Sequence, residues 1–153
     1  MWLWSIGGDS MAEYVANAVQ DVEVGQNVLL NDSIPCTKGY VIHRNGSGIL
    51  TLRGIVNGGC NQFARYQVEF NGNIAVPTGG TVGEISVALA INGEPIQTSR
   101  ARVTPAAVEN YFNVTSLANI TVPRGCCFTL SVENTSEGAI EVQNANLTIN
   151  RVA

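Results

Sequence analysis

The chain has 153 residues, of which 45% are hydrophobic and 13% are charged, and its formal net charge is −4. This length fits one domain with a substantial core, and the negative charge argues against a nucleic-acid binder, which needs a basic surface for phosphates. No apolar run reaches the roughly 20 residues of a membrane-spanning helix, so we expect no membrane span.

The first eleven residues, MWLWSIGGDSM, differ from everything that follows. They contain both tryptophans of the protein, a Gly-Gly-Asp-Ser stretch and a second methionine, Met11. We expect residues 1–11 to be a flexible N-terminal extension and residues 12–153 to form the domain.

Two interpretations of this extension stay open. In the first, it is a translated leader and Met11 is the natural start, because Gly-Gly-Asp-Ser-Met can be encoded by a bacterial ribosome-binding sequence placed just before a start codon. In the second, it is an apolar docking segment that inserts into a partner such as the major capsid protein, since exposed tryptophans often mark binding hot spots. The docking residues would be Trp2, Leu3 and Trp4.

Apolar residues recur at every second position along most of the chain, which is typical of half-buried antiparallel strands. In chain order the alternating segments are 49–52, 66–70, 85–91, 128–132 and 147–152. In the third of them Ile85, Val87 and Leu89 share one face, and Ser86 and Ala88 lie on the other. The pattern predicts an all-β, antiparallel two-sheet sandwich of the jelly-roll type.

Turn-forming clusters separate these strands. They read HRNGSG, VNGGCN, FNGN, VPTGG, INGEP, VPRG and ENTSEG. Asn-Gly pairs supply the positive φ angles that tight hairpins require. The one helix-like segment is TPAAVENYF, in which Thr104 is a candidate N-cap and Pro105 suits the first helical position; we expect a single turn there.

The residues that most often carry metal or redox chemistry are few and scattered. Cys126 and Cys127 are neighbours that point to opposite faces of a strand, there is no CxxC pair, and His43 has no second ligand at metal spacing. We expect free thiols, with a Cys36–Cys60 disulfide as the alternative, and we interpret His43 as a surface residue near a turn.

No arrangement of residues suggests catalysis. There is no nucleophile with a base and an orienting group, and no pair of carboxylates at a spacing for acid–base work. The glycine-containing stretches lack the strand-to-helix context of a phosphate loop. We therefore expect a protein that is not an enzyme, without catalytic residues, metal or cofactor.

From Tyr14 to Ala153 the sequence resembles the C1q/TNF-like jelly-roll family, in particular its bacterial and phage branch, which includes the C-terminal domains of exosporium collagen-like proteins and phage head-fibre proteins. The resemblance rests on the order and spacing of several stretches rather than on one motif. These are YVANAVQDVEVGQNVLLNDS, GYVIHRNGSGILTLRG, YQVEFNGNIAVP, GEISVALAINGEPI and the final NITVPRGCCFTLSVENTSEGAIEVQNANLTINRVA. The chain lacks the Gly-X-Y stalk and the clustered aspartates for calcium that some relatives carry.

The resemblance implies a ten-stranded sandwich that assembles as a homotrimer. A chain poor in charge also fits a protein that hides surface in oligomer contacts, because interfaces are depleted in charge and enriched in aromatic residues. We expect a largely apolar interface along the threefold axis. Its candidate residues, which could equally be core residues, are Tyr66, Phe70, Tyr111 and Phe112.

The functional expectation is a structural or adhesive protein of a bacteriophage virion, such as a head fibre, a capsid decoration protein or a tail-associated trimer. Its partners would be other copies of itself, the major capsid protein or another virion protein, and a host surface glycan. The alternative is an adhesin of the bacterial cell surface or spore coat, which would bind glycans with its loops.

Overall fold

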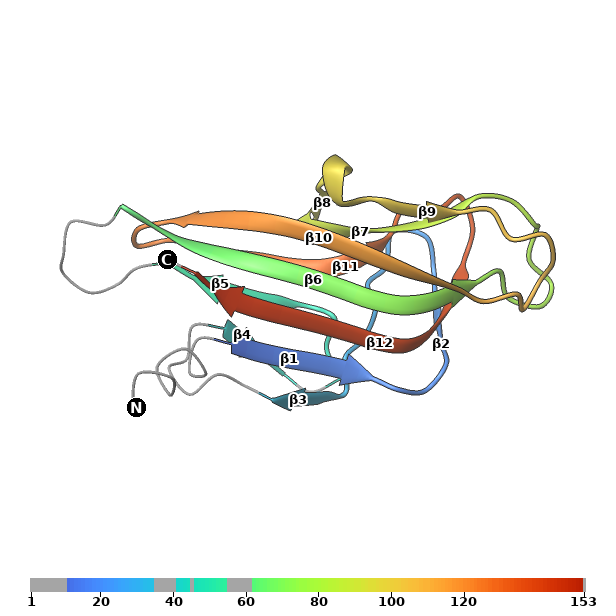
Figure 1. Ribbon diagram of the computed structural model, residues 1–153, viewed down its shortest axis with the longest axis horizontal. Coiled ribbons are helices and arrows are strands. Elements are labelled where there is room, and N and C mark those ends of the chain that lie inside the picture. Colours follow the sequence, from blue (N-terminus) through green and yellow to red (C-terminus); the bar gives the residue numbers. More distant parts are fainter. Residues whose placement is uncertain (1–10, 35–40, 45, 55–61, 153) are drawn as a thin grey trace.

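The computed structural model describes residues 11–34, 41–44, 46–54 and 62–152, and within them twelve strands form two antiparallel sheets that pack face to face (Figure 1). Sheet A has the order β10 (Phe112–Pro123), β6 (Phe63–Ala75), β12 (Ile140–Arg151), β1 (Met11–Ala16) and β3 (Asp32–Ile34), and β2 (Gln20–Val22) also pairs with β12. Sheet B has the order β4 (Val41–His43), β5 (Leu50–Arg53), β11 (Cys127–Asn134), β7 (Ile85–Ile91) and β8 (Glu94–Pro95), and β9 (Ala101–Val103) also pairs with β7.

The twelve strands occupy ten places in the two sheets. β1 and β2 both pair with the side of β12 that faces away from β6, so they fill one place as an interrupted strand. β8 and β9 likewise share the side of β7 that faces away from β11. The expected all-β, two-sheet jelly-roll sandwich is therefore confirmed, and the ten strands that the family resemblance implies are met once these two interruptions are counted.

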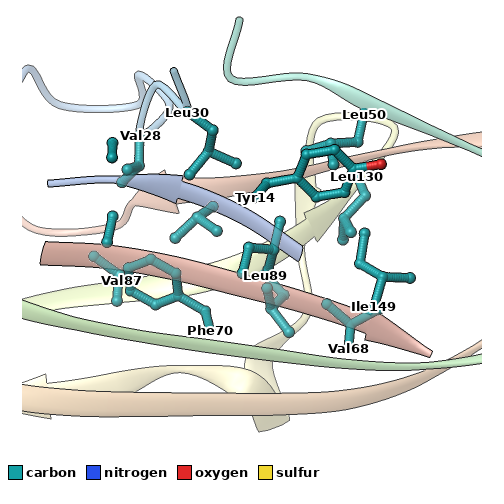
Figure 2. Packing of buried hydrophobic residues seen from close by; sticks show 14 of the residues in the cluster. Tyr14, Val28, Leu30, Leu50, Val68, Phe70, Val87, Leu89, Leu130 and Ile149 are labelled. Atoms are coloured by element: carbon teal, nitrogen blue, oxygen red, sulfur yellow. The ribbon is translucent and has the colours of Figure 1, made fainter. Parts of the chain in front are cut away.

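The core lies between the sheets and follows the alternation of the sequence. In β6, which is 13 residues long, every second side chain from Ala64 to Ile74 is buried. Figure 2 shows side chains such as Tyr14 of β1, Phe70 of β6 and Leu89 of β7 filling this space. Removing these apolar surfaces from water is the main stabilising term of such a sandwich.

The FNGN stretch is part of a strand and not a turn, which corrects the sequence-based expectation. Asn71, Gly72 and Asn73 continue β6, with β10 paired on one side and β12 on the other. A Cβ atom on Gly72 would lie 2.9 Å from the Cζ atom of Phe70, two residues earlier on the same face. Glycine is needed here because the aromatic ring occupies the space of its missing side chain.

Both faces of β7 are buried, although the alternation predicted only one buried face. Ser86, Ala88 and Ala90 point away from the core, and yet they are as buried as the apolar residues between them. β8, the 3₁₀ turn η1 (Gln97–Ser99) and β9 lie along the edge of β7 (Figure 1), and the Arg100 side chain that follows η1 covers Ser86, because its Nε donates to Ser86 Oγ at 3.1 Å. The hydroxyl of the buried Ser99 fixes η1 at this edge, because Oγ accepts a hydrogen bond from the Leu89 amide at 3.0 Å.

The turns vary in how well they follow the expectation. Asn92 and Gly93, with φ angles of 52° and 85°, form the expected hairpin between β7 and β8. The segment TPAAVENYF forms no helix, since η1 is the helical element of the described residues. Instead the backbone amide of Glu109, at φ 58°, donates to the Val76 carbonyl at 2.8 Å, so a contact with the β6–β7 loop replaces a helical hydrogen bond.

The histidine and the cysteines lie in different surroundings. His43 ends β4 half-buried, with its ring edge-on to Tyr14 at a centroid distance of 4.8 Å and its Nε2 atom 2.9 Å from the Ser47 carbonyl oxygen. It is therefore partly a core residue. Cys126 and Cys127 are free thiols, whereas Cys36 and Cys60 lie outside the described residues.

Met11 is the first residue of β1 and pairs with Asn150, so the strand begins where the expected extension ends. Trp2, Leu3 and Trp4 lie outside the described residues. Within the part of the chain that the structure describes, no helix has the length and apolar character to cross a membrane.

Candidate assembly face

The outward side of sheet A is covered by side-chain amides. It lies opposite the core, and its residues occupy the alternate, outward positions of β6, β10, β12 and β1. We call it the amide face. Its amides are Asn17, Gln67, Asn71, Asn73, Asn113, Asn119, Gln143, Asn144, Asn146 and Asn150. A sheet face with so little charge suits burial against another protein better than permanent exposure to water.

Hydrogen bonds connect these amides into a row that crosses the sheet. Asn113 Nδ2 donates to Asn73 Oδ1 at 3.1 Å, Asn73 Nδ2 donates to Asn144 Oδ1 at 3.3 Å, and Asn144 Nδ2 donates to Asn17 Oδ1 at 2.5 Å. A β-bulge in β12 makes the row possible, because Asn144 at φ 57° is an extra residue between the paired positions 143 and 146. These hydrogen bonds hold the amide side chains of the row in fixed positions in the single chain.

A shallow hollow of about 240 Å³ lies farther along the same face. Leu117 of β10 and Met11 of β1 are each 48% exposed and form its apolar sides. Its polar floor consists of Gln67, Glu69, Thr148 and Asn150. The combination of a polar floor and exposed apolar sides gives this face a place for a protruding side chain of a partner.

The rim of the amide face carries a tyrosine and three carboxyl groups. Register places Tyr111, Glu141 and Asp21 at one level of sheet A, since Glu141 pairs with Ala75 on one side and with Asp21 on the other. The Tyr111 hydroxyl donates to Glu141 Oε1 at 3.3 Å, which requires its ring to cross β6 above the buried Ala75. Glu109 joins this group and also accepts a hydrogen bond from the Thr78 amide at 3.1 Å.

These contacts change the ionisation of the rim. A hydrogen bond with Glu109, burial and the neighbouring charges raise the pKa of Glu141 from 4.5 to about 7, against a smaller lowering by the Tyr111 hydroxyl. Burial and the charges of Glu141 and Glu109 raise the pKa of Tyr111 to about 12. Near neutral pH the Glu141 carboxyl therefore retains a proton for part of the time and links the β9–β10 loop to sheet A.

The stability of the protein should fall as pH rises through this range. Between pH 4.5 and about 7 the folded state binds a proton at Glu141 that the unfolded state has released, so the free energy of unfolding decreases with pH. Glu141→Gln should remove this decrease, and screening by water limits the gain near pH 8 to about 1 kcal/mol. Urea unfolding between about pH 5 and pH 8 measures it. Glu23→Gln, at an exposed carboxyl outside the cluster, should leave the slope unchanged, and a variant at position 141 that retained the full slope would contradict this assignment.

The four aromatic residues proposed for the interface fall into three environments. Tyr66 and Phe70 are completely buried in the core of the single chain, because the alternation of β6 directs them inward, so neither has surface to offer a partner. Tyr111 lies on the rim of the amide face. Phe112 is the first residue of the edge strand β10. The alternation places it on the core side of the sheet, but at this strand end it is 39% exposed. Only Tyr111 and Phe112 remain candidates.

The amide face itself was missed by reasoning from the sequence. Its signal was present as asparagines two residues apart in strand segments, as in Asn71 and Asn73 or Asn144 and Asn146. The sequence predicts a turn at FNGN, because Asn and Gly are common in turns, and it assigns no role to Asn144 and Asn146. Only the pairing of β6 with β10 and β12 shows that they form one surface.

The sequence matches no protein-family model and no curated protein. Solved structures, however, show the same fold. The globular domain of zebrafish complement 1qA superposes with a TM-score of 0.64 at 12% identity, covering 94% of this chain and 98% of that one. Eiger TNF from S. frugiperda gives 0.62 at 13% identity, covering 94% and 92%. Murine APRIL gives 0.64 at 9% identity, covering 94% and 98%.

The chain therefore has the C1q/TNF-like jelly-roll fold. At these identities the likeness establishes the architecture, and the role of this particular chain is a separate question.

Proposed function

We propose that the chain is a homotrimeric structural or adhesive protein of a bacteriophage virion and that the amide face of sheet A forms its subunit interface. The observation that carries this proposal is a C1q/TNF-like sandwich with one sheet face that is almost free of charge. Four registered rows of outward residues, from the row of Asn73 to the row of Gln67, lie between Glu141 at one end of the face and Arg65 at the other. Within these rows Glu13 and Glu69 are the charged residues.

The proposed interface is polar rather than largely apolar, which revises the expectation from composition. Its exposed large apolar residues are Met11 and Leu117, and most of its other side chains are amides, several of which donate to one another elsewhere on the face. Amides can form hydrogen bonds across an interface without the desolvation cost of full charges. Such an interface can be both specific and tightly closed.

Size-exclusion chromatography with light scattering tests the assembly. We expect three chains per particle at micromolar concentration, and a permanent interface of more than about 2,000 Å² in total. The proposal would fail if the protein eluted as a monomer at this concentration.

The virion role needs a separate experiment. Support for it comes from the resemblance to phage head-fibre proteins and from a fold suited to display. Mass spectrometry of particles purified from an induced lysogen should detect the protein at the copy number of a structural component. Detection only in a spore-coat or cell-wall fraction would instead favour a bacterial surface adhesin.

A further inference from the structure

A cavity of about 280 Å³ opens at the end of the sandwich where three loops gather, on the right in Figure 1. It lies between the β6–β7 loop and the β11–β12 loop. Its apolar walls are Val76, Pro77, Val82 and Ile85, and its polar groups are Thr81, Glu84, Glu137 and the backbone of several glycines. It shares no residue with the hollow on the amide face.

The first wall of the cavity is held in place by the neighbouring β9–β10 loop. The Glu109 amide donates to the Val76 carbonyl at 2.8 Å, and the Glu109 carboxylate accepts from the Thr78 amide at 3.1 Å. A tight turn closes this wall, because the Gly80 amide donates to the Pro77 carbonyl at 2.9 Å. The loop is therefore fixed by its neighbour as well as by its own turn.

The second wall is supported by buried polar side chains. Asn134 Nδ2 donates to the Gly138 carbonyl at 3.0 Å, and Asn134 Oδ1 accepts from the Ser136 amide at 2.8 Å. The Ser136 hydroxyl donates to the Ser86 carbonyl at 3.1 Å and accepts from the Ser86 amide at 2.8 Å. All three side chains are buried. Two loops fixed in this way form a preorganised cavity, which lowers the cost of binding a ligand.

The chemistry of the lining selects the kind of ligand. The side-chain oxygens of Glu84 and Glu137 accept hydrogen bonds, and carboxylates repel anions. No group of three or more His, Cys, Asp or Glu side chains in the described residues is arranged to hold a metal ion, and Ca²⁺ needs six or more oxygen ligands. A molecule with several neutral hydroxyl donors and small apolar faces satisfies both carboxylates and contacts the apolar walls.

We propose that this cavity binds a single non-acidic monosaccharide unit, with Glu84 and Glu137 accepting hydrogen bonds from its hydroxyl groups. The volume of about 280 Å³ admits one sugar ring. This inference deepens the adhesive role proposed above and depends on that role for its biological meaning. The binding itself does not require the phage assignment.

Nuclear magnetic resonance of the ¹⁵N-labelled full chain tests the site with D-galactose, D-glucose and N-acetyl-D-glucosamine as probes. We expect at least one of them to shift backbone resonances of residues 76–85 and 137–139, with a dissociation constant on the order of millimolar. The variant Glu84→Ala/Glu137→Ala should weaken that binding by at least about tenfold, because two charged acceptors are lost. Glu94→Ala, at an exposed carboxylate on the β7–β8 hairpin, is the matched control and should bind like the unmodified protein.

D-glucuronate carries a carboxylate of its own as well as hydroxyl groups. It therefore tests whether Glu84 and Glu137 select the ligand or whether the cavity takes up any sugar. Its negative charge should reduce binding at least about tenfold relative to the best neutral probe. The proposal is overturned if no probe shifts these resonances at about 50 mM, or if D-glucuronate binds as well as the neutral sugars. If the protein is trimeric and no probe binds, only this site is contradicted. If the protein is monomeric and a sugar binds, only the proposed assembly is contradicted.

Discussion

Replacing Phe70 with alanine should lower the free energy of unfolding by about 3–5 kcal/mol, the range for buried aromatic residues. The ring is completely buried between the sheets, lies opposite Leu147 of β12, and also covers Gly72 in its own strand. The surrounding strands are hydrogen-bonded on both sides and cannot collapse into the cavity that alanine would leave. Urea denaturation followed by circular dichroism measures the change.

Phe63→Ala is the matched control for this substitution. Phe63 lies on the same strand but is 39% exposed, with the guanidinium of Arg65 stacked on its ring at 4.6 Å. Its loss should cost about 1 kcal/mol or less. Both variants must be compared at one protein concentration, because the stability of an oligomer depends on concentration. Equal effects of the two substitutions would contradict the placement of Phe70 in the core.

Replacing Leu117 with arginine should convert the proposed trimer into monomers without unfolding them. Leu117 points outward from β10 beside Glu69 and is 48% exposed in the single chain, so the fold can accept a longer side chain there. In the assembly the guanidinium and the Glu69 carboxylate beside it would be buried together three times, and removing such a pair from water can cost about 1–4 kcal/mol more than packing the original apolar side chain. Light scattering should report single chains at concentrations where the unmodified protein is trimeric.

The control for this substitution is Ile42→Arg. Ile42 is 54% exposed on β4, at the edge of sheet B and away from the amide face. This variant should remain trimeric, because the added charge stays in water. If Leu117→Arg remained trimeric while keeping its fold, the interface would have to lie elsewhere on the molecule.

Local alternation explains why much of the architecture could be predicted. The period of two in segments such as 66–70 and 147–152 is a property of neighbouring residues, and it correctly separates core-facing from outward positions in β6 and β12. The hairpin at Asn92 and Gly93 was predictable for the same reason, because a positive φ angle is a property of the residues in the turn.

The features that were missed depend on residues far apart in the chain. Nothing in the FNGN stretch itself indicates that β10 and β12, which come much later in the chain, pair on both sides of Asn71 and Gly72. Ser86 is covered by the side chain of Arg100, which comes from a later segment. The raised pKa of Glu141 depends first on a hydrogen bond with Glu109, which comes from another loop some thirty residues earlier. Each asparagine of the amide face has the local propensity of a turn residue. Only its pairing with strands far along the chain places it on the surface of a sheet instead.

The two Asn-Gly pairs of the described strands and hairpin have a consequence for the chemical durability of the protein. Asn-Gly is the dipeptide most prone to deamidation, in which the glycine amide nitrogen attacks the asparagine side-chain carbonyl and releases ammonia. Asn71-Gly72 is held extended in a strand paired on both sides, which keeps nitrogen and carbonyl apart. In Asn92-Gly93 the side-chain oxygen accepts hydrogen bonds from the Thr129 amide at 2.9 Å and from its hydroxyl at 3.2 Å. The strand pairing around Asn71 and the hairpin hydrogen bonds of Asn92 should therefore slow deamidation at both residues.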